Sequence, residues 1–260
     1  MKIAVCELPD GLDLSGAPWL QLIENLQDEK PDLLILNEMP VGDWIAVKRG
    51  FDRGTALRFA ASHDALLSEL ARFSWGTFGS RPVAGSGRLA NEAFLLANGS
   101  YHPAHHKHYF PQEEGWYERD WFAPVRPGFE VVDHGELRIG ALLCTELFFN
   151  EWARHYRRLG ANIIAAPRAA VGLNTRWSTA GAMAAIVSGC YVVSSNRSEH
   201  AQRPQGLFGG EGFVYDPNGE LVAKTSASSP IALVDIDLGM VKTAQQGYPC
   251  YVSELQDNVD

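Results

Sequence analysis

The sequence lacks features that would place it in several broad classes of protein. No apolar run approaches the roughly 20 residues that a bilayer-spanning helix needs, and no repeat of fixed period occurs. Basic residues are in the minority, because 22 Lys and Arg stand against 31 Asp and Glu, which gives a formal net charge of −9. Nucleic acids and anionic membranes both bind basic surfaces. The composition therefore argues against either partner.

Cysteine is also scarce. Four cysteines occur, Cys6, Cys144, Cys190 and Cys250, and none falls in a CxxC or zinc-finger spacing. The first residues, MKIAVCELPDG, are typical of a strand and lack the long apolar region of a secretory signal. We therefore expect a cytoplasmic protein whose cysteines are reduced thiols.

The 260 residues have a globular composition, with 46% hydrophobic and 20% charged residues. Apolar runs of strand length alternate with amphipathic segments, which is typical of βαβ units. Asn98-Gly99 and Asp216-Pro217-Asn218-Gly219 are turn signals between strand-like runs, so hairpins should make the sheet mixed. No linker or change of composition divides the chain. We expect one α/β domain over residues 1–260.

The periodicity predicts the positions of individual elements. Strands are expected at Lys2–Leu8, Asp32–Met39, Ala93–Leu96, Tyr101–Tyr109, Leu137–Cys144, Asn162–Ala166, Tyr191–Ser195 and Ile231–Ile236, with a hairpin over Gly212–Lys224. Helices are expected between Pro18 and Pro31, from about Thr55 to Phe73, from a cap at Asn150 to Gly160, and around Met183–Val187.

Two residues with possible chemistry follow buried strands. Cys144 ends the apolar run before a helix, where open α/β sheets place their ligand crevice. A semi-exposed thiol near the start of a helix favours the thiolate; the alternative is an inert core cysteine. Glu38 follows the run Leu33–Leu36, and a carboxylate there must be paired or solvated. Glu38 could equally cap a loop at the end of its strand.

A third segment, HHKHYFPQEEGWYERDWFAP, places Lys107 and Glu118 among aromatic residues. A thiol with a pKa near 8.5 is only about 3% ionised at neutral pH, so a nucleophilic cysteine needs a base or a cation beside it. A carboxylate can accept the thiol proton, and a lysine can stabilise an oxyanion together with the N–H of the residue after the cysteine, Thr145. Each charge could also be a solvated group on an edge hairpin.

The order of Glu38, Lys107 and Cys144 resembles the nitrilase superfamily of carbon–nitrogen hydrolases. The resemblance covers nearly the whole chain and rests on the following segments: KIAVCEL, DLLILNEMP, KHYFPQEEGWYERDWF, GALLCTELFFNEWARHYRRLGANII, SSNRS and GGEGFVYDPNGELVAKTS. It implies a four-layer α-β-β-α sandwich, with Glu38 as base, Lys107 as oxyanion lysine and Cys144 as nucleophile. The family's second glutamate maps best onto Glu118, in the manner of the amidase and carbamoylase branches, and Glu114 is the competing position.

The resemblance also implies an activity. We expect a hydrolase that cleaves a non-peptide C–N bond of a small amide or N-carbamoyl compound through a cysteine thioester, with no metal or organic cofactor. The alternatives are a nitrilase and a catalytically silent binding protein. A homodimer or a higher homo-oligomer is expected. Asn37-Glu38 replaces the usual Pro-Glu, and Thr145-Glu146 departs from the common residues after the nucleophile, so the substrate stays open.

Other signals carry weaker expectations. Arg168 follows a buried strand and could hold a substrate carboxylate, although pairing with an acidic side chain is an alternative. Trp44 and Trp121 are candidates for the pocket lining, against the default of core aromatics. The histidines of YHPAHHKHY invite a metal site, but no nearby Cys or carboxylate in the sequence completes a ligand set, so we expect none.

Overall fold

The computed structural model describes residues 1–85, 87–200, 202 and 206–254. Its first sheet has seven strands in the order β12-β1-β2-β3-β4-β5, with β15 also paired to β1. These strands are β1 (Lys2–Pro9), β2 (Leu33–Ile35), β3 (Gly76–Ala84), β4 (Leu89–Ala97), β5 (Ser100–His106), β12 (Asn196–Ser198) and β15 (Ile231–Asp235). The β1/β2 and β2/β3 pairs are parallel, whereas β3/β4, β4/β5 and β1/β15 are antiparallel. The predicted mixed sheet is confirmed.

The second sheet has six strands in the order β14-β13-β11-β10-β9-β8. They are β8 (Val132–His134), β9 (Leu137–Ala141), β10 (Ile163–Ala165), β11 (Tyr191–Ser194), β13 (Phe213–Tyr215) and β14 (Leu221–Lys224). A separate pair, β6 (Gln112–Glu113) and β7 (Trp116–Tyr117), precedes the short helix α3 (Glu118–Trp121).

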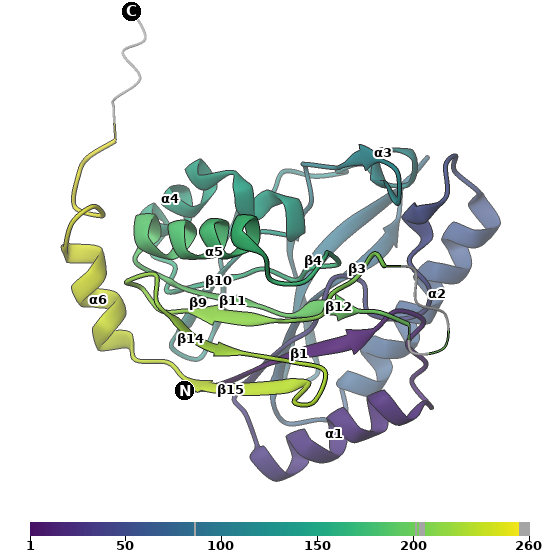
Figure 1. Ribbon diagram of the computed structural model, residues 1–260, viewed down its shortest axis with the longest axis horizontal. Helices are drawn as coiled ribbons and strands as arrows, with labels where there is room; N and C mark the ends of the chain where they lie inside the picture. The colour runs from purple at the N-terminus through teal and green to yellow at the C-terminus, as the bar shows by residue number, and fades with distance from the viewer. Residues whose placement is uncertain (86, 201, 203–205, 255–260) are drawn as a thin grey trace, which may run out of the picture.

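The longer helices cover the outer faces of the two sheets (Figure 1). Helices α1 (Ala17–Glu29) and α2 (Arg53–Leu70) pack on the first sheet, and α4 (Asn150–Arg158) and α5 (Thr175–Ser188) pack on the second. Helix α6 (Leu238–Gln246) follows β15, and two short 3-10 helices, η1 (Ile45–Val47) and η2 (Cys144–Phe148), lie in connections. The layers are therefore α-β-β-α, as expected.

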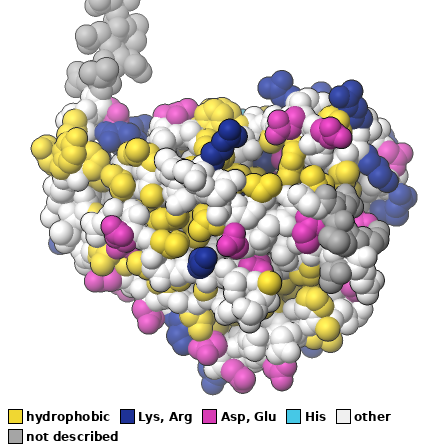
Figure 2. Space-filling model, in the orientation of Figure 1, with side chains coloured by type: hydrophobic (Ala, Val, Ile, Leu, Met, Phe, Trp, Pro, Cys, Tyr) yellow, Lys and Arg dark blue, Asp and Glu magenta, His cyan; other side chains and the backbone are white. Residues whose placement is uncertain are grey.

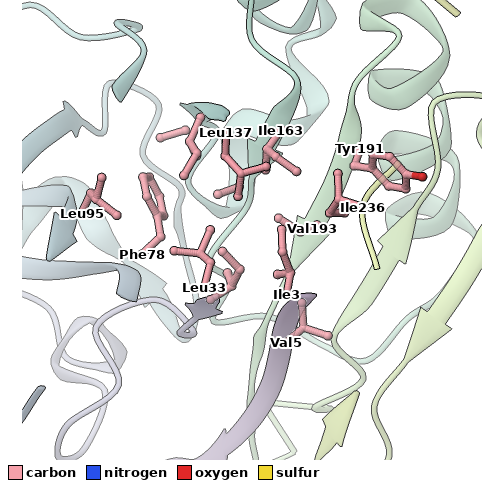
Figure 3. Close-up of a cluster of buried hydrophobic side chains, with 14 of the residues drawn as sticks. Ile3, Val5, Leu33, Phe78, Leu95, Leu137, Ile163, Tyr191, Val193 and Ile236 are labelled. Atoms are coloured by element: carbon pink, nitrogen blue, oxygen red, sulfur yellow. The ribbon is translucent and has the colours of Figure 1, made fainter. Parts of the chain in front are cut away.

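Alternating side chains on the strands explain why the sheets can pack on both faces. On β1, Ile3 and Val5 point into the core between the sheets, while Ala4 and Cys6 join the core under α1 and α2. Figure 3 shows side chains of both sheets meeting in this central core, among them Leu33 and Phe78 from one sheet and Leu137 and Ile163 from the other. A strand buried on both faces needs a continuous apolar run, which is what the sequence has at this strand.

Three strands are shorter than the sequence pattern predicts. The expected strand Asp32–Met39 is regular only over β2, because the chain turns at Met39, whose φ is +41°. The strand expected to reach Tyr109 stops at the end of β5, and the one expected to reach Cys144 stops at the end of β9. The predicted cap at Asn150 is wrong, since Asn150 is the first residue inside α4. The functional candidates thus lie just beyond strand ends.

The surface carries charges of both signs. Figure 2 shows acidic side chains scattered over the face in view, among basic and hydrophobic ones. Within the described part of the chain, no helix has the length and apolar character needed to cross a membrane.

Candidate active site

Glu38 lies just beyond β2 and is completely buried. Its backbone N–H donates to the carbonyl of Arg168 at 3.2 Å. Arg168 follows β10, so this bond ties the loop after β2 to a loop of the second sheet. Its Oε1 accepts two hydrogen bonds, from Asn91 Nδ2 at 2.7 Å and from Lys107 Nζ at 2.8 Å. Its Oε2 has no hydrogen-bond partner among the described residues. One carboxylate oxygen is therefore anchored and the other is available to accept a proton.

Lys107 follows β5 and is held in place by its backbone, whose N–H donates to Asn91 O at 2.9 Å. Its Nζ lies between two carboxylates, 2.8 Å from Glu38 Oε1 and 2.7 Å from Glu118 Oε2. Burial by itself lowers the pKa of a lysine, but the charges of Glu118 and Glu38 outweigh burial here and raise the pKa of Lys107. The lysine is therefore a fixed, buried cation.

Glu118, the first residue of α3, is also buried. Burial raises the pKa of Glu118 to about 7; Lys107 opposes this rise, and the negative charge of Glu38 adds to it. Its Oε1 has no hydrogen-bond partner in the part of the chain that the structure describes. Glu114, the competing position, is exposed. The geometry therefore brings Glu118, rather than Glu114, to the lysine.

Cys144 begins η2 in a left-handed backbone conformation, with φ of +49°. Such a conformation is costly for a residue with a side chain and persists only where the surroundings impose it. The Cys144 N–H donates to Pro167 O at 3.0 Å, and this bond holds the turn. The turn lies beyond the end of β9, and the Cys144 side chain lines a cavity there.

The expectation of a semi-exposed thiolate at Cys144 is wrong. The residue is only 4% exposed. Burial raises the pKa of the Cys144 thiol, and the negative charge of Glu38 raises it further, while Lys107 lowers it. The short helix that begins at Cys144 does not outweigh these effects. These effects favour the protonated thiol over the thiolate.

A cavity of about 250 Å³ opens at this cluster and is lined by Cys144, Thr145 and Glu118. Its apolar lining includes three aromatic residues, Trp116, Phe148 and Trp177. Glu113 and Arg176 contribute one charge of each sign. Thr145 is the second residue of η2, and the first N–H groups of a helix have no carbonyl within the helix to bond to. A small molecule in this cavity would contact the thiol directly.

The other predicted binding residues lie elsewhere. Arg168 is fully buried, and it donates from Nε to Ser194 Oγ at 2.8 Å and from Nη2 to Glu211 O at 2.9 Å. Its guanidinium lies over the rings of Trp177 and Phe213, at 4.9 Å and 4.6 Å from their centroids. Arg168 is therefore behind the cavity wall, and its role toward substrate stays a prediction.

Trp44 and Trp121 belong to a neighbouring buried cluster and line a different cavity, of about 690 Å³. Trp116, which packs 6.2 Å from Trp44 between ring centroids, lines the cavity at Cys144 instead. In a region so rich in tryptophan, the sequence alone does not distinguish which indole faces the thiol.

Asn91 and Arg197 are two contributors that sequence reasoning missed. Asn91 anchors Glu38 from β4, and its only signal was the polar pair Asn91-Glu92 between apolar residues of that strand. Arg197, in the SSNRS segment, is fully buried and donates to Asp10 at 2.6 Å and to Gly42 O at 2.9 Å. It also donates to the carbonyl of Met39. Arg197 therefore fixes the loop that carries Glu38.

The chain is similar in sequence to known hydrolases. A sequence profile described as carbon–nitrogen hydrolase matches residues 17–246. An N-carbamoylputrescine amidase of Arabidopsis thaliana is 30% identical over 181 residues, which cover 64% of this chain and 60% of that protein. An omega-amidase of Bos taurus is 25% identical over 188 residues, covering 69% and 67% of the two chains. A nitrilase of Pyrococcus abyssi is 29% identical over 127 residues, covering 48% and 47%.

Solved structures share the fold. A carbon–nitrogen hydrolase from Helicobacter pylori superposes with a TM-score of 0.81 at 19% identity, covering 96% of this chain and 94% of the other. An amidase from Nesterenkonia sp. gives a TM-score of 0.74 at 19% identity, covering 93% and 92%. At such low identity these matches establish the four-layer architecture alone.

Proposed function

Because the chain belongs to the carbon–nitrogen hydrolase family, we propose that it cleaves a non-peptide C–N bond of a small amide or N-carbamoyl compound. The product nitrogen leaves as ammonia or an amine. The observation that carries the proposal is the placement of Lys107 Nζ between Glu38 and Glu118, beside a cavity lined by Cys144. The amidases among the relatives support the reaction class.

In the first half of the proposed reaction, Glu38 Oε2 accepts the proton of the Cys144 thiol as the sulfur attacks the carbonyl carbon. The carbonyl oxygen becomes an oxyanion, which Lys107 Nζ and the Thr145 N–H stabilise. The tetrahedral intermediate then collapses. The C–N bond breaks, Glu38 returns the proton to the leaving nitrogen, and an acyl thioester remains on Cys144.

In the second half, Glu38 removes a proton from water and the resulting hydroxide attacks the thioester carbon. The C–S bond breaks, the sulfur takes the proton back, and the carboxylic or carbamic acid leaves. Glu118 positions Lys107 by accepting a hydrogen bond from its Nζ. The Oε1 atom of Glu118, which has no partner among the described residues, is placed to contact substrate. The raised pKa of the thiol suits this scheme, since proton transfer and attack occur together.

The experiment that tests the proposal compares three matched substrates with the same alkyl group: butyramide, N-carbamoylpropylamine and butyronitrile. Ammonia release is measured with wild-type protein and with Cys144→Ala. We expect turnover of the amide or the carbamoyl compound, and none by the variant. Turnover of the nitrile alone would favour the nitrilase alternative. A wider metabolite screen that finds no turnover would favour a silent binding protein.

A further inference from the structure

The histidines beside Lys107 are paired with buried glutamates on both sides. His105 Nδ1 accepts a hydrogen bond from the Phe129 N–H at 3.0 Å, so the ring proton is on Nε2, which faces Glu146 Oε2 at 2.8 Å. His106 Nδ1 accepts from the Val125 N–H at 3.3 Å, and its Nε2 faces Glu92 Oε2 at 2.9 Å. Each ring is thus a neutral imidazole that donates to a carboxylate.

These contacts account for two of the four histidines that invited a metal site in the sequence, His105 and His106. Both ring nitrogens of His105 are occupied by hydrogen bonds, and so are those of His106. Over residues 1–85, 87–200, 202 and 206–254, no group of three or more metal-ligating side chains is found. His105 and His106 therefore serve as hydrogen-bond partners of Glu146 and Glu92.

Glu146 has the more informative set of contacts. This fully buried carboxylate accepts three N–H groups: His105 Nε2 at 2.8 Å, the Leu143 backbone at 2.9 Å and the His108 backbone at 2.7 Å. Leu143 precedes the nucleophile, in the short segment between β9 of the second sheet and η2. His105 lies on β5 of the first sheet and His108 follows that strand, so the two residues bracket Lys107. One side chain therefore joins the two segments that carry Cys144 and Lys107.

We propose that Glu146 is a positioning residue that sets the placement of Lys107 relative to Cys144 by bonding both segments at once. The inference rests on Cys144 being the nucleophile of the proposed function. Three acceptor contacts require a carboxylate, since both oxygens receive N–H donors. A change of about 1 Å between a nucleophile and the group that stabilises its oxyanion can cost a hundredfold in rate.

Glu146 also acts on Glu118 through charge. Lys107 lowers the pKa of Glu118, whereas the negative charges of Glu38 and Glu146 add to its rise, and the Cys144 thiol lines the same cavity. Without that charge, the pKa of Glu118 should fall. This gives the proposal a readout that a purely structural residue would not move.

The test uses Glu146→Gln. Glutamine keeps the shape, but only one of its two terminal atoms accepts hydrogen bonds, so at least one of the three N–H groups faces another donor. We expect kcat toward the best amide to fall about 10- to 100-fold with little change in KM. Alkylation of Cys144 by iodoacetamide should slow, and the limb of the pH profile governed by Glu118 should move to lower pH.

The matched control is Glu92→Gln. It removes the Glu92 carboxylate, which pairs with His106. Among the described residues, Glu92 makes no hydrogen bond or ion pair with the turn over residues 143–148. We expect Glu92→Gln to lower the melting temperature but to leave kcat and the alkylation rate close to wild type. Equal losses of kcat in both variants would contradict the proposal, as would a folded Glu146→Gln with wild-type rates.

A second variant covers the case in which Glu146→Gln does not fold. His105→Gln disturbs only one of the three contacts, and we expect a smaller loss of kcat with an intact circular dichroism spectrum. A folded His105→Gln with unchanged kcat and alkylation would also contradict the proposal. If the wild-type protein hydrolyses no amide, carbamoyl compound or nitrile, the proposed function fails, while alkylation of Cys144 still tests the positioning.

Discussion

Lys107 and Glu38 lie 69 residues apart in the sequence, yet Lys107 Nζ donates to Glu38 Oε1 at 2.8 Å in a fully buried ion pair. β2 precedes Glu38 and β5 precedes Lys107, within a single sheet, and Asn91 bonds to both residues from β4. The pair therefore links three strands at the edge where the cavity opens.

Removing the cation should damage both stability and activity. In Lys107→Met, Glu38 and Glu118 face each other without a counter-charge, and breaking a buried pair in this way costs about 3–5 kcal/mol. We expect a lower free energy of unfolding in urea and no amide turnover. The double variant Lys107→Met/Glu118→Gln removes one of the stranded charges. It should regain part of the stability and none of the activity, and recovery of turnover would exclude an oxyanion role for Lys107.

The Glu118 carboxyl predicts a pH-dependent stability. Its pKa is raised from the ordinary 4.5 to about 7, chiefly by burial, so the folded state binds more protons than the unfolded state between these values. Stability from this group is complete below about pH 4.5 and is lost as the pH rises through about 7. Relative to Glu118→Gln, the melting temperature of the wild type should therefore decline over this range. A constant difference between the two proteins would refute the assignment.

Asn91 should matter although it does not touch the cavity. Asn91→Leu keeps the branched shape of the side chain but removes the donor to Glu38 Oε1, so the carboxylate can rotate away from the thiol. We expect kcat to fall about tenfold or more while KM changes little, because the lost interaction positions a base rather than the substrate. Steady-state kinetics on one amide measures this. Gln21, exposed on α1, gives the control variant Gln21→Leu, which should be neutral.

Arg168 gives a prediction about specificity. Its guanidinium lies behind Trp177 and bonds to Ser194 and Glu211 O, so the geometry favours a structural part. We expect Arg168→Met to lower kcat/KM for succinamate and for butyramide by similar factors, with a reduced melting temperature. A much larger loss for the acidic substrate would instead establish the carboxylate-binding role that the sequence suggests.

The sequence predicts most of the strand and helix order, because strands such as β1 and β2 are continuous apolar runs and the outer helices have one apolar face. It misses β3, whose sequence GTFGSRPVA contains no such run. Glu38 and Cys144 stand out because each ends an apolar segment, and Lys107 stands out because it lies in an expected strand among aromatic residues. Strand ends are harder to place. The turns at Met39 and Cys144 have positive φ imposed by long-range bonds, such as that from the Cys144 N–H to Pro167 O, which local patterns do not encode.

The sequence also does not predict the protonation of the Cys144 thiol or the contacts of Glu146. A cysteine at the start of a helix suggests a thiolate, but burial and the nearby Glu38 reverse the effect on its pKa. In the sequence, Glu146 is an acidic residue two positions after the nucleophile, and nothing local marks it as a residue with several partners. Its three contacts come from residues 3 and about 40 positions away, so only the fold brings them together.

The central claim is that Cys144 forms a covalent acyl intermediate, and intact-protein mass spectrometry tests it most directly. The protein is mixed with excess amide, quenched in acid within the first turnovers and digested to locate the adduct. We predict a mass increase equal to the acyl group on the peptide that contains Cys144, absent from Cys144→Ala and unchanged in Cys190→Ala. Amide turnover by Cys144→Ala, or an acyl group found on another residue, would contradict the account.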